Sequence, residues 1–399
     1  MVQSRRPMAS PREKPRVLFV NAGILGLVSL HEFLRVMLPR QSEIAWDQVL
    51  LPERLTLSDR LVRRILTQRL WRDGWLGIAN LDLARFRAEL NTGIHARRRI
   101  RELGSDRYDV LHFHRTGAAY ASLDLMRRIP SIVSIDCTQD CVIDAAASAV
   151  ERSTYGLNAW LDGRIFATAA AIVATSHWAA RTLRSRYPAC ETPVHVLADP
   201  VMLDRFDPGW ADARARRAAR GERPRFLFVG GDFPRKGGYE LLEAWRAGGL
   251  ADEAELEIVT DWPLADAPPR GVRLTRGVRR HTPEWERCWR EADVFVMPTR
   301  NEAFGLVYQE AGAAALPAIG TAHNAIPEIV LHDRTGLLVP VGDRPALVAA
   351  MQALARDPMR RQALGTAARR HIEQVASPDA YLAALLAIIR SVTRARALG

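Results

Sequence analysis

Two glutamates stand eight positions apart in the C-terminal half of the chain, on either side of a Phe-Gly pair. Glu302 follows a predicted strand, Phe304-Gly305 marks a predicted helix start, and Glu310 lies further into that helix. A helix N-terminus offers unpaired N–H groups and a positive dipole end, which favour a bound phosphate. Gly305 lets a ligand approach the backbone, and the carboxylates could accept hydrogen bonds from sugar and ribose hydroxyls. The alternative is that Glu302 caps the helix and Glu310 is solvated.

A glycine-rich turn after an earlier predicted strand carries two adjacent cations, Arg235 and Lys236. Glycines flank them on both sides, at Gly230, Gly231, Gly237 and Gly238. The turn is not a nucleotide-triphosphate loop, because no Gly-Lys-Ser/Thr follows at the required spacing. It does place positive charge where a diphosphate would meet the N-terminus of the next helix. A flexible turn with solvated charges is the alternative.

The elements that must position these loops follow a regular alternation of strand and helix. In the first half, apolar runs rich in β-branched residues predict strands at 17–21, 110–114, 131–136, 171–176 and 194–198. In the second half they predict strands at 225–230, 255–260, 272–277, 293–298, 317–321 and 336–340. Alternating strands and helices predict an α/β fold with parallel sheets covered on both faces. Ligands of such sheets bind beyond the carboxyl ends of the strands.

The two series predict two doubly wound, Rossmann-like domains facing a central cleft, at 15–207 and 208–376. The 399 residues suffice for both. We expect residues 1–14 to form a disordered basic arm, since they lack the apolar segment of a secretory signal. Residues 377–399 predict a terminal helix with an apolar face, which could cross to the N-terminal domain.

The formal net charge of +11 favours negatively charged partners, such as phosphorylated ligands or anionic lipid surfaces. Between Arg54 and Arg107 there are 13 Arg against 6 Asp or Glu, with Trp71 and Trp75 among them. A basic amphipathic surface for an anionic membrane and a merely solvated surface are both open. No recognisable motif points to nucleic acid. The four cysteines, which form no Cys-x-x-Cys pair, suggest reduced thiols in a cytosolic protein: Cys137, Cys141, Cys190 and Cys288.

Taken together, the two loops and the segments that follow them resemble a known family. The order is the Arg-Lys-Gly turn, the Glu-x7-Glu around Phe-Gly, then GTAHNAIPEIV and DRTGLLVP. The segment from about 225 to 345 is similar to the donor domain of family 4 retaining glycosyltransferases, of group 1 type, which have the GT-B fold. The N-terminal half matches more loosely.

The resemblance implies a role for each matching residue. Lys236, with Arg235, would neutralise the donor diphosphate, and Glu302 would meet the hydroxyls of the transferred sugar. Glu310 would hold the ribose. Backbone at the remaining donor positions would contact sugar, phosphate or base: Gly230, Gly231, Phe304, Gly305, Leu306, Gly277 and Val278. Retention would follow from attack on the face from which the phosphate leaves.

Two positions depart from the family pattern. Such enzymes usually carry an arginine in the glycine turn several residues before the lysine, where this chain has Gly231 or Asp232, so Arg235 would substitute. Many also have a histidine after an N-terminal strand, where this chain has Asp136. The donor sugar therefore stays open.

On the acceptor side, the loop after the first strand contains Gly23 and Gly26, and His114 ends a strand. Together with Asp136 they are the candidate acceptor-side residues. A dinucleotide motif is disfavoured in the first loop, because Asn21 stands where it needs glycine. His112 and His114 share a strand face, but no third metal ligand accompanies them, so buried histidines are favoured. The absence of Asp-x-Asp favours a metal-independent enzyme with no cofactor.

These patterns predict transfer of a sugar from a nucleotide-diphosphate sugar to a glycan or lipid-linked acceptor. Synthesis of cell-surface polysaccharide or glycoconjugate, in the cytoplasm or at the inner membrane face, would fit. A sugar-nucleotide epimerase or sugar phosphorylase of the same fold, or a non-catalytic binding subunit, stays open, and a nicotinamide enzyme is a remote alternative. Fold alone does not choose among them.

Overall fold

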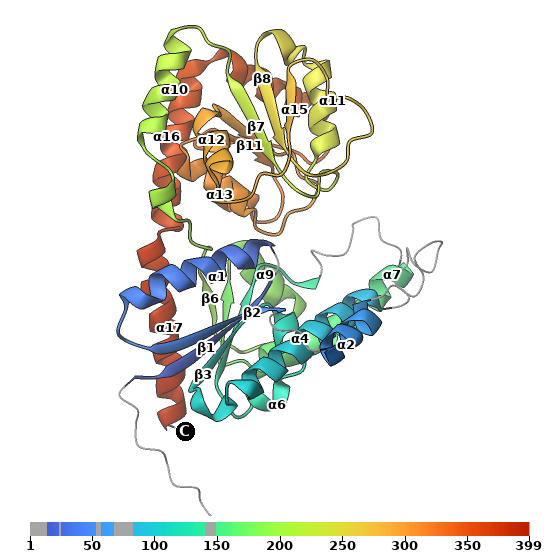
Figure 1. Ribbon diagram of the computed structural model, residues 1–399, viewed down its shortest axis with the longest axis vertical. Coiled ribbons are helices and arrows are strands. Elements are labelled where there is room, and N and C mark those ends of the chain that lie inside the picture. The colour runs from blue at the N-terminus through green and yellow to red at the C-terminus, as the bar shows by residue number, and fades with distance from the viewer. Residues whose placement is uncertain (1–13, 24, 53–56, 68–82, 140–148, 399) are drawn as a thin grey trace, which may run out of the picture. The chain divides into compact units, whose positions relative to one another are not determined.

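A computed structural model describes residues 14–23, 25–52, 57–67, 83–139 and 149–398 (Figure 1). The chain divides into two compact units. Unit 1 comprises the described parts of Met1–Ala174, Arg184–His195 and Leu382–Gly399, and unit 2 comprises Thr175–Leu183 and Val196–Tyr381.

Unit 1 is built on a six-stranded sheet of order β2-β1-β3-β4-β5-β6. Its strands are β1 (Arg16–Ala22), β2 (Ala45–Leu51), β3 (Val110–His114), β4 (Ser131–Ile135), β5 (Ala171–Ala174) and β6 (Val194–Val196). Every residue of β3, β4 and β5 is buried. The run of apolar residues in these strands is typical of parallel strands covered on both faces.

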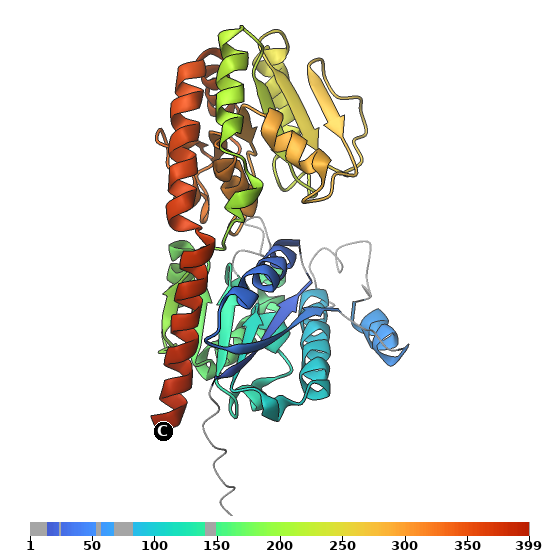
Figure 2. The ribbon, with the colours of Figure 1, turned by 60° about the vertical axis from the view of Figure 1, so that its left-hand side comes forward.

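Helices flank this sheet (Figures 1 and 2). They are α1 (Leu25–Met37), α2 (Leu57–Thr67), α4 (Ala84–Glu102), α5 (Thr116–Ala119), α6 (Leu123–Met126), α7 (Ala149–Thr154), α8 (Gly156–Thr168), part of α9 (His177–Arg186) and most of α17 (Pro378–Leu398). The apolar face of α17 is buried within unit 1, through Leu382, Leu385, Leu386, Ile388, Ile389 and Val392. The stretch Pro358–Ala395 is long and apolar enough to span a membrane by length and composition alone. Several of its apolar side chains are those that α17 buries in unit 1, so core packing accounts for part of its hydropathy.

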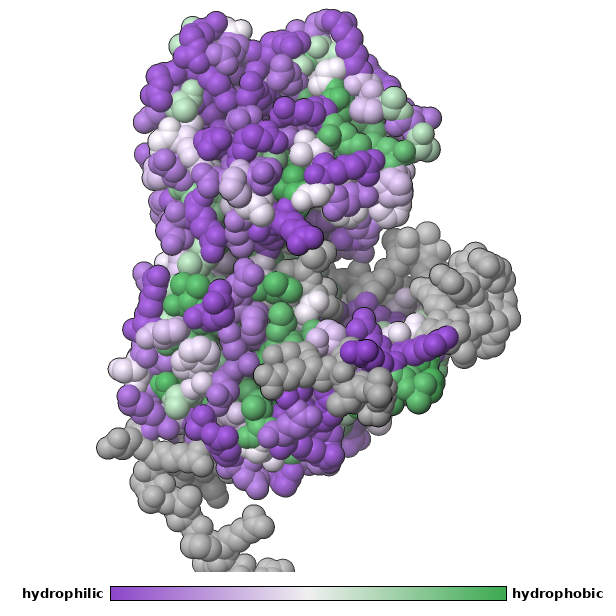
Figure 3. Space-filling model, in the orientation of Figure 1, coloured by the Kyte–Doolittle hydropathy of each residue, from purple (hydrophilic) through white to green (hydrophobic). Residues whose placement is uncertain are grey.

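Unit 2 carries a second six-stranded sheet, of order β12-β11-β10-β7-β8-β9. The strands are β7 (Arg225–Val229), β8 (Glu255–Val259), β9 (Val272–Thr275), β10 (Val294–Val296), β11 (Ala318–Thr321) and β12 (Gly336–Val339). The helices are α10 (Gly209–Ala219), α11 (Gly238–Ala247), α12 (Pro283–Glu291), α13 (Leu306–Ala313), α14 (Ile326–Ile329), α15 (Arg344–Arg356) and α16 (Pro358–Val375). Pairings in both sheets are parallel, as for β7 with β8 and β10. Hydrophilic side chains cover most of the face of unit 2 in Figure 3.

The predicted α/β class with two doubly wound, parallel sheets is confirmed, and each predicted strand overlaps an observed one. The prediction missed β2. This edge strand carries Asp47 and Gln48 at its centre, so it lacks the apolar run used to find the others. Asp47 is used structurally, since its Oδ2 accepts hydrogen bonds from Arg16 Nη2 at 3.0 Å and from Tyr108 Oη at 3.0 Å.

The structure sets the unit boundary differently from the predicted 207/208. Residues 196–207 belong to unit 2, and so does the first part of α9. Val201 N, for example, donates to Ala376 O at 3.1 Å within unit 2. The predicted arm at 1–14 lies outside the described residues except for Lys14, and so do Trp71, Trp75 and Cys141.

Candidate functional site

The strand order of unit 2 creates a switch point between β7 and β10. From β7 the chain proceeds to β8 and β9 on one side, and from β10 to β11 and β12 on the other. The chain connections after β7 and after β10 therefore run to opposite sides of the sheet. At such a point the loops beyond the carboxyl ends of the two strands, here β7 and β10, lie on either side of a crevice. These are the two loops that carry the predicted donor residues.

The loop after β7 folds tightly against the end of β10. Gly237 has φ +76, and a Cβ there would come within 1.9 Å of Pro298 O. A Cβ on Gly230 would meet the Lys236 side chain at 2.5 Å, whereas one on Gly231 would meet nothing within 4 Å. Gly237 is therefore required for the close approach of the two loops, whereas the flexible Lys236 side chain could move away from a Cβ on Gly230.

Lys236 and Glu302 meet at the switch point. Lys236 Nζ lies 2.9 Å from Glu302 Oε2, and the two side chains are only 18% and 17% exposed. Arg235 Nη1 lies 3.6 Å from the same oxygen and donates to Asn301 O at 2.5 Å. Its Nε contacts Asp232 Oδ2 at 2.9 Å. The interpretation of this turn as flexible with solvated charges is wrong for Lys236.

Backbone and side-chain bonds hold the two loops together. Arg235 O accepts from Arg300 N at 2.9 Å and from Thr299 Oγ1 at 3.1 Å. Asn324, which follows β11, donates through Nδ2 to Glu302 O at 3.1 Å. The sequence reasoning did not select Asn324, although it lies in the GTAHNAIPEIV segment.

The two helices that begin at the switch point both start from a left-handed glycine. Gly237 precedes α11 and Gly305 precedes α13, and within the described residues no side chain caps either helix. By contrast, Asp343 and Asp357 cap α15 and α16 through their side chains. Uncapped N–H groups at a helix start are an anion-binding feature. Glu302 is therefore not a helix cap.

Tyr308 packs beneath Gly305 and supports the loop from below. A Cβ on Gly305, which has φ +94, would come within 2.8 Å of the Tyr308 ring. Tyr308 Oη donates to Met297 O at 2.5 Å. Burial and the neighbouring Glu302 carboxylate raise the pKa of Tyr308, so it remains a donor. Phe304 is buried and Leu306 is the half-buried first residue of α13.

Glu310 is buried and forms an ion pair with Arg280. The interpretation of Glu310 as a solvated residue is therefore wrong. Arg280 comes from the loop after β9, which also contains Gly277 and Val278. Gly277 has φ +70, and its N donates to Asp261 Oδ1 at 2.7 Å. Sequence reasoning missed Arg280, because no spacing rule connects it to Glu310.

Unit 1 has its own switch point, between β1 and β3. Gly23 follows β1, and its N donates to Leu51 O at 2.5 Å; a Cβ there would lie 2.1 Å from the same oxygen. Gly23 therefore has a packing role, and Gly26 lies in α1. Asp136 follows β4 and is half-buried.

His112 and His114 are fully buried in the core of unit 1. His112 Nε2 lies 2.7 Å from Ser134 Oγ, and His114 Nδ1 is hydrogen-bonded to Asn21 Oδ1. Burial, with a smaller contribution from His31, lowers the pKa of His114 to about 3. No group of three potential metal ligands occurs among the described residues.

Arg115, which sequence reasoning did not select, directly follows β3 in a conformation with φ +86. Its Nη2 lies 3.5 Å from Glu89 Oε1. Burial alone would lower the pKa of Arg115, but Glu89, Asp136 and Asp162 raise it overall. A non-glycine residue held at positive φ beside a switch point marks a candidate acceptor-side position.

Family comparisons match both halves of the chain. Residues 223–357 match the family described as Glycosyl transferases group 1, and residues 77–205 match Glycosyltransferase Family 4. The chain belongs to the family 4, group 1 type glycosyltransferases. In this family 4 glycosyltransferase, both switch-point loops of unit 2 fall inside the group 1 match.

Curated relatives of this family 4 glycosyltransferase include a D-inositol 3-phosphate glycosyltransferase of Streptomyces avermitilis. It is 33% identical over 262 residues, covering 57% of this chain and 55% of that protein. A GDP-mannose-dependent alpha-(1-6)-phosphatidylinositol monomannoside mannosyltransferase of Mycolicibacterium smegmatis is 32% identical over 212 residues, covering 47% and 55%. The chain thus spans about half the length of these relatives.

Solved structures show the same fold. The sucrose-phosphate synthase of Thermosynechococcus elongatus has a TM-score of 0.72 at 17% identity, covering 96% of this chain and 100% of that one. Anabaena Alr3699/HepE, in complex with UDP and glucose, has a TM-score of 0.65 at 14% identity, covering 94% and 100%. The predicted GT-B fold of this family 4 glycosyltransferase is confirmed.

Proposed function

We propose that this chain is a retaining glycosyltransferase that uses a nucleotide-diphosphate sugar, with its donor site at the switch point of unit 2. The observation that carries the proposal is the meeting of Lys236 and Glu302, from two separate loops, beside two uncapped helix starts. Relatives whose names specify GDP-mannose and a fold neighbour in complex with UDP and glucose support a donor of this class.

In the proposed mechanism the donor diphosphate lies at the N-termini of α11 and α13. Lys236 and Arg235 would neutralise the negative charge that grows on the leaving phosphate as the glycosidic bond breaks. Lys236 is paired with Glu302 in the structure. Donor binding would therefore exchange one partner of Lys236 for another, and free the Glu302 carboxylate for hydroxyls of the sugar.

Glu302 would act on the sugar itself. The anomeric carbon becomes positively charged in an oxocarbenium-like transition state, and a fixed carboxylate nearby stabilises that charge. The acceptor hydroxyl attacks the face from which the phosphate departs, and its proton passes to the leaving phosphate oxygen. Products are the glycoside with retained anomeric configuration and a nucleoside diphosphate.

We place the ribose at Glu310 and the base near Gly277 and Val278. Arg280 forms an ion pair with the Glu310 carboxylate. A bound ribose would therefore displace Arg280 or share the carboxylate with it. The half-buried Val278 offers an apolar contact for a base. This assignment explains why a loop outside the Glu-x7-Glu segment contributes to the site.

The proposed acceptor is a glycan or a lipid-linked sugar, and the proposed location is the cytoplasm or the inner membrane face. The relative named for phosphatidylinositol monomannoside supports a lipid-linked acceptor. The exposed side chains of Leu61 and Ile65 on α2, among Arg60, Arg63 and Arg64, support contact with an anionic membrane.

A turnover assay tests the proposal. UDP-, GDP-, ADP- and dTDP-sugars are incubated with the chain, with and without EDTA, and the released nucleoside diphosphate is measured. Early NMR spectra then give the anomeric configuration of the released or transferred sugar. We expect one donor to be cleaved with retention, without dependence on metal. Inversion would contradict the mechanism. Interconversion of the donor into another sugar nucleotide would favour an epimerase, and cleavage that requires added inorganic phosphate would favour a phosphorylase.

A further inference from the structure

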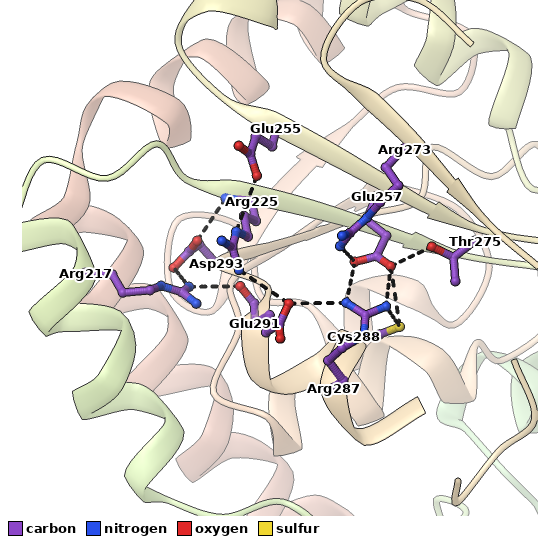
Figure 4. A network of polar contacts seen from close by, with 10 residues as sticks. All are labelled: Arg217, Arg225, Glu255, Glu257, Arg273, Thr275, Arg287, Cys288, Glu291 and Asp293. Atoms are coloured by element: carbon purple, nitrogen blue, oxygen red, sulfur yellow. Dashed lines mark hydrogen bonds and ion pairs between the residues drawn. The ribbon is translucent and has the colours of Figure 1, made fainter. Parts of the chain in front are cut away.

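A carboxylate that the proposed mechanism does not use, Glu257, lies in the middle of β8 and is almost fully buried. Its Oε1 accepts hydrogen bonds from Arg287 Nη2 at 2.7 Å and from Thr275 Oγ1 at 2.7 Å. Its Oε2 accepts from Arg273 Nη2 at 2.6 Å. Figure 4 shows these side chains converging on Glu257 from β9 and α12.

Two of these partners lie on the strand and the helix that flank one loop. Thr275 is the last residue of β9, and Arg287 lies in α12, which begins at Pro283. A single carboxylate therefore ties together the start and the end of loop 276–282. Charge-assisted hydrogen bonds of this kind are the stronger ones, and they fix geometry as well as energy.

The loop held in this way carries Arg280 to Glu310. Its backbone adopts positive φ at Gly277 (+70) and at His281 (+65). A left-handed backbone is costly for a non-glycine residue such as His281, so the surrounding structure must hold it there. If the flanking elements were released, the loop would relax to other conformations. The place of Arg280 beside Glu310 therefore depends on how firmly the ends are held.

The same network has a second half, centred on Asp293, whose partners lie on α10 and β7 and which joins the first half through Glu291 (Figure 4). Asp293 accepts from Arg217 Nη2 at 2.8 Å and from Arg225 N at 2.8 Å. Its side chain is 11% exposed, against 9% for Glu257. Asp293 is therefore a matched control: it is a carboxylate of equal burial that also binds an arginine, but it holds α10 and β7 in place of loop 276–282.

We propose that Glu257 is a positioning residue for the donor nucleotide, because it clamps loop 276–282 and so holds Gly277 and Val278, the proposed contacts of the base, in place. This inference rests on the proposed function, in which the loop and Glu310 receive the nucleoside. The clamp does not contact Lys236 or Glu302. Its loss should weaken nucleotide binding while leaving the turnover of bound donor nearly unchanged.

The experiment compares Glu257→Gln, Thr275→Val and Asp293→Asn with the wild-type chain. Calorimetry gives the Kd of UDP and of GDP, donor hydrolysis gives KM and kcat, and a thermal melt reports folding. Thr275→Val removes only one hydroxyl and leaves both arginines on the carboxylate, so it remains informative if Glu257→Gln does not fold.

We expect Glu257→Gln to raise the Kd of the better-bound nucleotide and the donor KM by about tenfold, because a displaced loop loses its contacts. Thr275→Val should raise the nucleotide Kd and the donor KM by roughly threefold, because it weakens the hold on the same loop. In either variant kcat should change by less than about twofold. The ratio of the UDP and GDP dissociation constants should also change. Asp293→Asn should leave both dissociation constants within about twofold of wild type.

Unchanged dissociation constants in both Glu257→Gln and Thr275→Val would overturn the inference. So would an equal weakening in Asp293→Asn at a comparable loss of Tm, since that would reduce the effect to general destabilisation. If the wild-type chain binds neither UDP nor GDP nor any other nucleoside diphosphate, the proposed function fails and this inference fails with it.

Discussion

At the scale of single residues, the site depends on charges that already have partners. Lys236 is paired with Glu302 and Arg280 with Glu310. In the proposed mechanism, a donor would therefore compete with these internal ion pairs for Lys236 and Glu310. The sequence placed Lys236 and Glu302 in loops after two predicted strands, and the family resemblance assigned both to one donor site; that the two strands are neighbours at a switch point comes from the structure. The sequence could not predict Arg280 at Glu310, because a loop conformation with positive φ brings them together.

Glu302→Gln and Lys236→Met should each abolish most donor turnover while the fold is retained. Glu302→Gln keeps the shape but removes the negative charge that stabilises the transition state, and we expect a loss of about 100-fold or more in kcat. Lys236→Met removes neutralisation of the diphosphate and should raise the donor KM as well. Steady-state kinetics checks both, with circular dichroism as the folding control. Wild-type turnover in both variants would exclude these roles.

Asp162 provides a pH-dependent test of unit 1. Burial raises the pKa of Asp162 to about 6, even though hydrogen bonds such as that from Gln139 lower it. Because its pKa is raised in the folded state, the buried Asp162 carboxyl is tolerated when it is protonated and destabilises the fold when it is charged. Its contribution to the free energy of unfolding is therefore fully present below pH 4 and is lost as the pH rises through 6. Asp162→Asn should therefore stabilise the chain at pH 8 by on the order of 2 kcal/mol and give no gain at pH 4. Thermal melts at both pH values measure this, and equal shifts would contradict it.

At the scale of elements, helix starts divide into capped and open. Side chains cap α12, α15 and α16, whereas α11 and α13 start from glycines. The sequence predicted a helix start at Phe304-Gly305 that a ligand could approach, and left open whether Glu302 caps it; the structure shows a left-handed Gly305 with no side-chain cap. The prediction missed β2, because an edge strand with Asp47 at its centre lacks an apolar run. The Glu257 clamp was also beyond prediction, because no spacing rule connects a carboxylate in β8 to its partners in β9 and α12.

Gly305→Ala should damage both folding and donor binding. The added Cβ would lie 2.8 Å from the Tyr308 ring at a residue with φ +94, so we expect a loss of roughly 1–3 kcal/mol in the free energy of unfolding. Nucleotide binding should weaken further, because the N-terminus of α13 would move. Denaturant unfolding and calorimetry check the two effects. Gly156→Ala, where a Cβ meets nothing within 4 Å, is the control and should be nearly neutral.

At the scale of the whole molecule, the net charge of +11 is shared unevenly along the chain. Helix α2 exposes Leu61 (60%) and Ile65 (59%) among Arg60, Arg63 and Arg64. Exposed apolar residues between cations are typical of helices that lie on an anionic lipid surface. The basic stretch between Arg54 and Arg107 also includes residues 68–82, which lie outside the described part of the chain.

Vesicle flotation should therefore detect binding to phosphatidylserine-containing vesicles but not to neutral ones. Replacing Arg60, Arg63 and Arg64 by Gln should weaken binding by about 1 kcal/mol per arginine, with a steep dependence on salt. Leu61→Gln with Ile65→Gln should weaken it at every salt concentration. Met359→Gln, at an exposed apolar position of unit 2, is the control. Equal binding to neutral and anionic vesicles would contradict this role for α2.

The central claim is that a nucleotide-diphosphate site lies at the switch point of unit 2, and direct binding tests it without any knowledge of the acceptor. Calorimetry with UDP, GDP, ADP and dTDP is compared between the wild-type chain and Lys236→Met, in the presence of EDTA. The account predicts that one nucleoside diphosphate binds to the wild-type chain and that its Kd rises by about tenfold or more when the phosphate-neutralising cation is lost. Binding of equal strength to both proteins, or no binding to the folded wild-type chain at millimolar concentration, would contradict it.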